Sequence, residues 1–90
     1  MTNTELLMKA LGWQGGTVHQ VASDTGLTVS EVLNLHTAPI SNRIAYDHGL
    51  KAVKLDVVDI CGYQAYRICA YRPDRISFWR GVLDAQKAQK

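Results

Sequence analysis

The sequence predicts one α+β domain with three or four N-terminal helices, a β-hairpin and a C-terminal helix. Apolar residues recur at helical spacing as far as residue 36, and again from residue 74. Between residues 51 and 71 they recur at every second position, which is typical of strands. Ninety residues are the size of a single domain, so we expect all of these elements to share one core.

The first two helices are expected on either side of a glycine-rich run. The first helix covers about residues 3–11, and Asn3 or Thr4 can serve as its N-cap. Thr17 is a good N-cap for the second helix. Gly26 stands where a residue of positive φ would end that helix, so we expect a tight turn there.

A third helix follows the turn. Thr28 or Ser30 can cap it, and it should end near His36, because Pro39 cannot continue it. Residues 40–50 allow two interpretations, since their apolar residues fit either helical spacing or alternation before a turn. We favour a helix for this segment.

The second half of the chain predicts a hairpin and a last helix. Alternating apolar residues indicate strands around 53–57 and 66–70, and residues 59–64, which contain a glycine, are the natural connection. The hairpin as a whole spans about residues 51–71. A helix with one apolar stripe is expected over about 74–87. A two-stranded hairpin is marginally stable alone, so it should pack on the helices.

The charge is mildly basic and unevenly distributed. The net charge is +2, with one lysine against three acidic residues in 1–40 and nine basic against five acidic residues in 41–90. No apolar run approaches the roughly 20 residues that a membrane span needs, and no secretion signal is recognisable at the N-terminus. We therefore expect a cytoplasmic protein that does not enter a membrane.

Residues 17–36 resemble the helix-turn-helix of bacterial and phage regulators. This resemblance depends on a small residue in the first helix, a glycine in the turn and apolar residues where the helices cross, namely Val21, Ala22, Gly26, Leu27, Val32 and Leu35. With the predicted hairpin, the likeness extends to winged helix-turn-helix proteins of phage or plasmid type as far as about residue 71. Pro39 and residues 40–50 depart from that pattern, because they separate the third helix from the wing.

The resemblance implies a small DNA-binding transcription regulator that reads the major groove of double-stranded DNA with residues 28–36. It also allows a homodimer. The base-contacting positions that it implies are Thr28, Val29, Ser30, Glu31 and Asn34. The candidate phosphate contacts are Thr17, Gln20, Arg43, Lys51, Lys54 and Arg67. The base-contacting positions include no Arg or Lys, so the commonest contact to guanine is missing from them.

A second hypothesis is an adaptor or inhibitor that binds a protein partner and not DNA, since the helix-turn-helix segment is acidic and the predicted wing is apolar. We expect no enzyme and no cofactor, because no nucleophile–base pair or phosphate-binding loop is recognisable. We expect no metal site either, because His19, His36 and His48 are widely spaced. Cys61 and Cys69 are expected to be free thiols.

Overall fold

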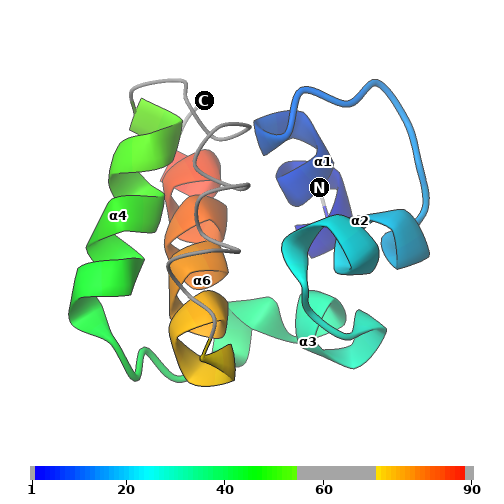
Figure 1. Cartoon of the computed structure of the whole chain (residues 1–90). Coiled ribbons are helices and arrows are strands. Elements are labelled where there is room, and N and C mark those ends of the chain that lie inside the picture. Colours follow the sequence, from blue (N-terminus) through cyan, green and yellow to red (C-terminus); the bar gives the residue numbers. More distant parts are fainter. Residues whose placement is uncertain (1, 55–70, 89–90) are drawn as a thin grey trace.

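The computed structural model describes residues 2–54 and 71–88, and every regular element in these two segments is helical. The elements are α1 (Asn3–Ala10), α2 (Val18–Thr25), α3 (Val29–Leu33), the 3₁₀ helix η1 (Leu35–Thr37), α4 (Arg43–Lys54) and α6 (Arg72–Ala88) (Figure 1). None of the described helices is both long enough and apolar enough to cross a membrane.

The predicted α+β class, with its hairpin wing, is wrong. Residues 51–54, which were expected to begin the first strand, form the last turn of α4. Here a helical spacing outweighs the two-residue alternation, because the buried residues of α4 follow one face of the helix: Ala45, Tyr46, Gly49, Ala52 and Val53. The remainder of the predicted hairpin, residues 55–70, lies outside the described residues.

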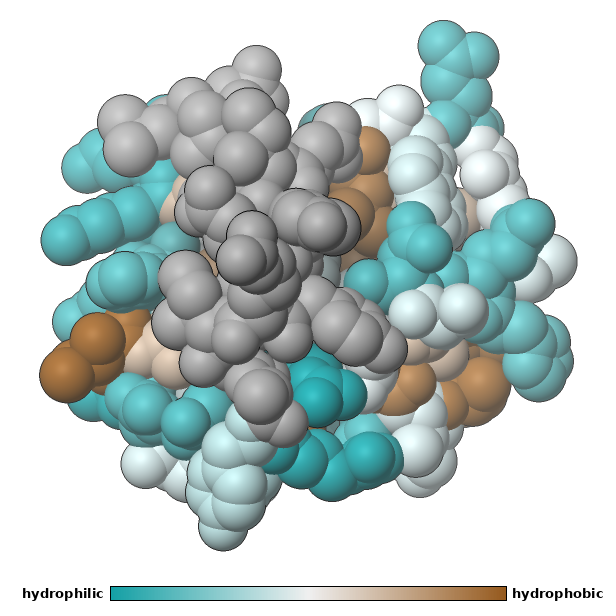
Figure 2. Space-filling model, in the orientation of Figure 1, coloured by the Kyte–Doolittle hydropathy of each residue, from teal (hydrophilic) through white to brown (hydrophobic). Residues whose placement is uncertain are grey.

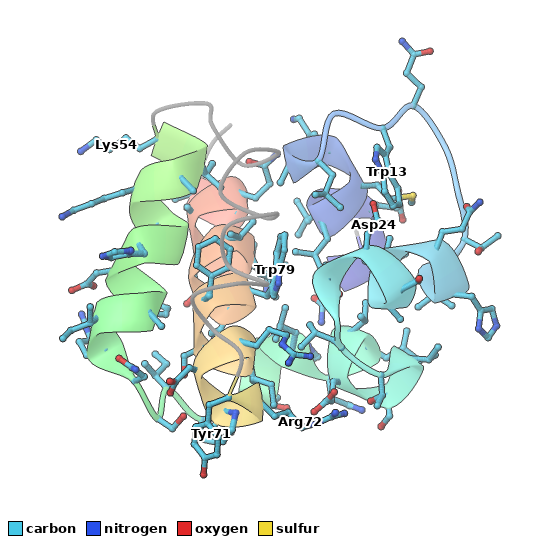
Figure 3. The ribbon with its side chains drawn as sticks, in the orientation of Figure 1. Trp13, Asp24, Lys54, Tyr71, Arg72 and Trp79 are labelled. Carbon is cyan, nitrogen blue, oxygen red and sulfur yellow. The ribbon has the colours of Figure 1, made fainter. Side chains whose placement is uncertain are left out.

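α6 lies at the centre of the described structure. α4 packs along one side of it, with the N-termini of both helices at the same end, and α1, α2 and α3 lie on the other side (Figure 1). Trp79 of α6 is 1% exposed and points toward α1–α3 (Figure 3). Fully buried side chains from the three N-terminal helices complete this core, namely Leu7, Val21 and Val32. The hydrophobic core under α1, α2 and α3 is therefore completed by a side chain of α6.

Two glycines set the distance between α4 and α6. A Cβ atom on Gly49 would overlap the Phe78 carbonyl oxygen, and a Cβ atom on Gly81 would overlap the Tyr46 carbonyl oxygen. Only glycine therefore permits the two backbones to approach this closely.

The start of α4 is held from α6. The Ser77 hydroxyl is fully buried, accepts hydrogen bonds from the backbone N–H groups of Ser41 and Asn42, and donates one to the Pro73 carbonyl. Asn42 then caps α4 by accepting from the Ala45 N–H at 3.1 Å. One hydroxyl from α6 thus fixes the loop that enters α4.

All three N-terminal helices begin with a capping box. The pairs are Thr2 with Glu5, Thr17 with Gln20, and Thr28 with Glu31, and in each the threonine and the third helical residue bond each other's backbone. The predicted caps at Thr17 and Thr28 are confirmed. The N-cap of α1 is Thr2 and not Asn3 or Thr4.

The turn between α2 and α3 has the predicted geometry. Gly26 has φ 74° and ψ 17°, the left-handed conformation expected of it. The residues expected where the helices cross are buried: Val21, Ala22, Leu27, Val32 and Leu35. The third helix is shorter than expected, because α3 ends at Leu33 and η1 replaces its last turn. The helix favoured for residues 40–50 is present as α4, and the last helix begins at Arg72.

Candidate nucleic-acid interface

The outward face of α3 and η1 is uncharged. Its exposed residues Ser30, Leu33, Asn34 and Thr37 recur at helical spacing, and we call them the α3 stripe. Leu33 is 52% exposed, which is unusual for a leucine beside a packed core. Val29, one of the base-contacting positions that the resemblance implies, is only partly exposed and packs against the core. Leu33 is therefore the apolar side chain that this face presents, and it was not among the base-contacting positions expected from the resemblance.

Three of the sequence-predicted base contacts, Thr28, Glu31 and Asn34, already have partners within the protein. The Glu31 carboxylate accepts from the Thr28 N–H at 2.7 Å and from Arg72. The Asn34 side-chain amide donates to the Ser30 carbonyl at 3.0 Å, which leaves its Oδ1 as an acceptor. Thr28 and Ser30 are exposed, although the Thr28 hydroxyl caps α3.

Arg72 brings a cation to the first turn of α3 (Figure 3). Its Nε and Nη2 atoms donate to the two carboxylate oxygens of Glu31 at 3.0 and 2.6 Å. Burial raises the pKa of Glu31, but the Thr28 N–H and the Arg72 guanidinium together lower it below its ordinary value. Sequence reasoning missed Arg72 because it lies 41 residues from Glu31 along the chain.

An open cleft of about 500 Å³ lies beside the α3 stripe. Its polar lining comes from both described segments of the chain and comprises Ser30, Glu31, Asn34, Thr37, Ser41 and Arg72. Its apolar lining comprises Ala38, Pro39, Pro73 and Ile76. The cleft therefore joins the α3 stripe to the N-terminal end of α6.

The carbonyl groups at the end of α3 are bound by α1. The Asn3 side-chain amide donates to the carbonyls of Val32 and Leu33 at 3.2 and 3.1 Å, and it lies 2.8 Å from Nδ1 of His36. These contacts occupy backbone acceptors that a short helix would otherwise leave to water. They hold α3 against α1 from behind the stripe.

Two further arginines of α6 bind backbone carbonyls on either side of the α3–η1 segment. Arg75 donates to the Gly26 carbonyl and Arg80 to the Ala38 carbonyl, both at 2.6 Å. Arg80 also pairs with Asp84 at 3.1 Å, and Asp84 accepts from the Tyr46 hydroxyl. This hydrogen bond to Asp84, together with burial, raises the pKa of Tyr46. These guanidinium groups thus bind the protein itself.

The candidate phosphate contacts do not gather on one face. Thr17 and Gln20 are exposed at the N-terminus of α2, where they bond each other. Lys51 and Lys54 are exposed near the C-terminal end of α4, and Lys54 lies at the opposite end of the view from Arg72 (Figure 3). Arg67 lies outside the described residues.

Arg43 is placed differently, at the N-terminal end of α4. This end lies near the start of α6, because the Ser41 hydroxyl bonds the Pro73 carbonyl at 3.2 Å. Arg43 pairs with Asp47 at 3.4 Å and lies over the Tyr46 ring at 5.1 Å. Of the three cations of α4, it is the one nearest in the chain to the cleft.

On the face that Figure 2 shows, the described residues form no extended apolar patch. In Figure 2, apolar colouring is broken into small separate areas between hydrophilic atoms. The large exposed apolar residues of the described segments are Leu33, Ile40, Ile44 and Tyr71. No group of three His, Cys, Asp or Glu side chains in residues 2–54 and 71–88 could hold a metal ion. Cys61 and Cys69 are outside these segments.

Comparison with known proteins adds no further assignment. No protein-family model, no curated protein and no solved structure matches this chain.

Proposed function

We propose that this chain is a DNA-binding transcription regulator that inserts α3 into the major groove. The observation behind the proposal is the α3 stripe, an exposed and uncharged row of side chains directly after a left-handed Gly26 turn. Hydroxyl and amide groups bond base edges, and an exposed leucine can contact a thymine methyl. The α3 stripe therefore offers a groove three hydrogen-bonding side chains and one apolar side chain.

The hydrogen bonds that hold α3 in place favour the same function. Asn3 binds the carbonyls at its C-terminal end, and Arg75 binds the carbonyl of the turn that precedes it. A reading helix must be held in one position if its side chains are to distinguish bases. These long-range hydrogen bonds provide that rigidity for a helix of only five residues.

The backbone contacts in this proposal come from two places. Thr17 and Gln20 lie at the N-terminus of α2, which is the first helix of the helix-turn-helix pair. The N–H groups at a helix N-terminus favour a phosphate. Arg43 supplies a cation from the end of α4 nearest the cleft. Its side chain is 73% exposed, and its ion pair with Asp47 at 3.4 Å is longer than the 2.6 Å pair of Arg72 with Glu31. Because one short helix contacts few base pairs, we expect two copies to bind two half-sites.

A matched pair of substitutions tests the proposal. Leu33→Glu puts a carboxylate on the α3 stripe, whereas Ile44→Glu makes the same kind of change on α4, where the side chain is 72% exposed. Binding of fluorescent random-sequence and locus-derived duplexes should be measured at about 50 and 200 mM salt. We expect the wild type and Ile44→Glu to bind with a strong salt dependence and Leu33→Glu to lose binding.

Two results would contradict the proposal. One is an absence of salt-dependent binding of the wild type to any duplex. The other is equal binding by the Leu33 and Ile44 variants. If a stoichiometric complex with a protein is instead abolished by Leu33→Glu alone, the α3 stripe is a protein-docking surface and the adaptor hypothesis replaces this one.

A further inference from the structure

We infer that Arg72, oriented by Glu31, reads a guanine in the bound DNA. This inference rests on the proposed function and adds a specificity-determining residue to it. Arg72 belongs to α6 and not to the helix-turn-helix, but its guanidinium lies against the first turn of α3.

The orientation of the guanidinium is determined by a chain of hydrogen bonds. The Glu31 carboxylate is held by the Thr28 N–H within the capping box of α3. That carboxylate then holds the Nε–Nη2 edge of Arg72 with two hydrogen bonds. A flexible side chain is thereby fixed relative to α3 before any ligand binds, which lowers the entropy lost on binding.

The remaining edge of the guanidinium is available to a ligand. Among the described residues, Nη1 of Arg72 makes no hydrogen bond, and the side chain is 51% exposed at the rim of the cleft. Arginine has five N–H groups in a fixed plane, so two of them can bond one partner while others bond a second. Ser30 and Asn34 of the α3 stripe line the same cleft as Arg72.

The charge of the pair indicates the kind of acceptor. Glu31 neutralises Arg72, so the pair has little net attraction for a phosphate. Guanine presents two uncharged acceptors, O6 and N7, at the spacing of a guanidinium edge. A neutralised but rigid arginine therefore suits a base edge better than the DNA backbone. This supplies the guanine contact that residues 28–36 lack in their own sequence.

The test starts from the duplex that the wild type selects out of a random library. We expect one G·C pair per half-site whose replacement by A·T weakens wild-type binding about 10- to 100-fold. Arg72→Lys keeps the charge but loses the bidentate edge, so it should bind the G·C and A·T duplexes alike. Lys87→Arg, a charge-conserving change at an exposed position in the last turn of the same helix, is the control and should keep the wild-type preference.

A second variant separates orientation from charge. Glu31→Gln can retain the capping box, because Gln20 has this role at the start of α2. It should reduce the preference for the G·C pair while leaving binding to random duplexes undiminished. Thermal melts establish that each variant is folded. A loss of stability alone would not alter the preference for one base pair.

The outcomes distinguish this inference from the proposed function. If the wild type binds no duplex, both are wrong. If it binds a selected site but Arg72→Lys and Glu31→Gln keep the same base preferences, DNA binding stands and the role of Arg72 is wrong. If Arg72→Lys weakens all duplexes equally, Arg72 contacts phosphate and the guanine assignment is wrong.

Discussion

Gly49 of α4 and Gly81 of α6 each lie directly against the backbone of the other's helix. Their missing side chains permit the contact, because any Cβ atom would overlap a carbonyl oxygen of the opposing helix. This close approach also places the entry loop of α4 within reach of Ser77.

The first prediction concerns this glycine contact. Gly81→Ala should lower the free energy of unfolding by at least about 2 kcal/mol, because the cost of forcing the helices apart exceeds the helix propensity gained from alanine. In a domain of this size, such a loss lowers Tm by about 10 °C. Gly15→Ala is the control, since nothing lies within 4 Å of its Cβ position. Equal melts of the two variants would contradict the packing described for α4 and α6.

The second prediction concerns the buried hydroxyl of Ser77. Ser77→Ala leaves the N–H groups of Ser41 and Asn42 without their acceptor, so urea denaturation should show a loss of about 1–3 kcal/mol. Ser23 is exposed and makes no side-chain hydrogen bond within the described residues. Ser23→Ala should therefore stay within about 0.5 kcal/mol of wild type. A Ser77 variant as stable as the Ser23 variant would show that the start of α4 does not depend on this hydroxyl.

The third prediction concerns the turn at Gly26. Gly26→Ala should cost about 1–2 kcal/mol, because the left-handed conformation strains any residue with a Cβ atom. Gly26→Asn should cost less, since asparagine tolerates this conformation better than other non-glycine residues. The order of the two melting temperatures is the measurement. An alanine variant as stable as the asparagine variant would contradict the observed φ.

The fourth prediction concerns pH. Because the pKa of Glu31 is lowered in the folded protein, its ionised form contributes stability above the ordinary Glu pKa, and this contribution is lost as pH falls through the lowered value. Glu31→Gln should therefore lower the free energy of unfolding by roughly 0.5–1 kcal/mol at pH 7. The difference from wild type should be smaller at pH 3 than at pH 7. Urea denaturation at the two pH values measures it.

A matched substitution controls for the capping box itself. Glu5 has the equivalent position in α1 and no ion pair with a described residue. Glu5→Gln should therefore have a smaller effect at pH 7 than Glu31→Gln. If the Glu31 variant differs from wild type by the same amount at both pH values, Arg72 does not stabilise the Glu31 carboxylate.

The helix starts and the turn could be predicted from the sequence because their causes are local. Thr17, Gly26 and Thr28 each act on backbone groups within a few residues of themselves. The strand predicted from Lys51 was wrong because the same residues satisfy two periods. Ala52 and Val53 belong to a helical face whose partner, α6, lies at least 19 residues further along the chain.

The candidate site was predicted only in part, for a related reason. Ser30 and Asn34 were found because they follow the turn in sequence. Arg72 could not be found, since nothing in the sequence distinguishes it from the other arginines as the partner of Glu31. Which ionic groups meet depends on how α6 packs against α3, and that depends on the whole core.

The position of Trp79 has a consequence for synthesis on the ribosome. The three capping boxes are complete once residue 31 has been added, so the starts of α1, α2 and α3 can form early. However, the hydrophobic core that these helices share is completed by Trp79 of α6. The arginines that bind the carbonyls of Gly26 and Ala38 also belong to α6. A nascent chain that stops at Lys54 should therefore emerge with helix starts but without a stable tertiary structure. The proposed DNA-binding surface on α3 should therefore become ordered only when α6 has left the exit tunnel.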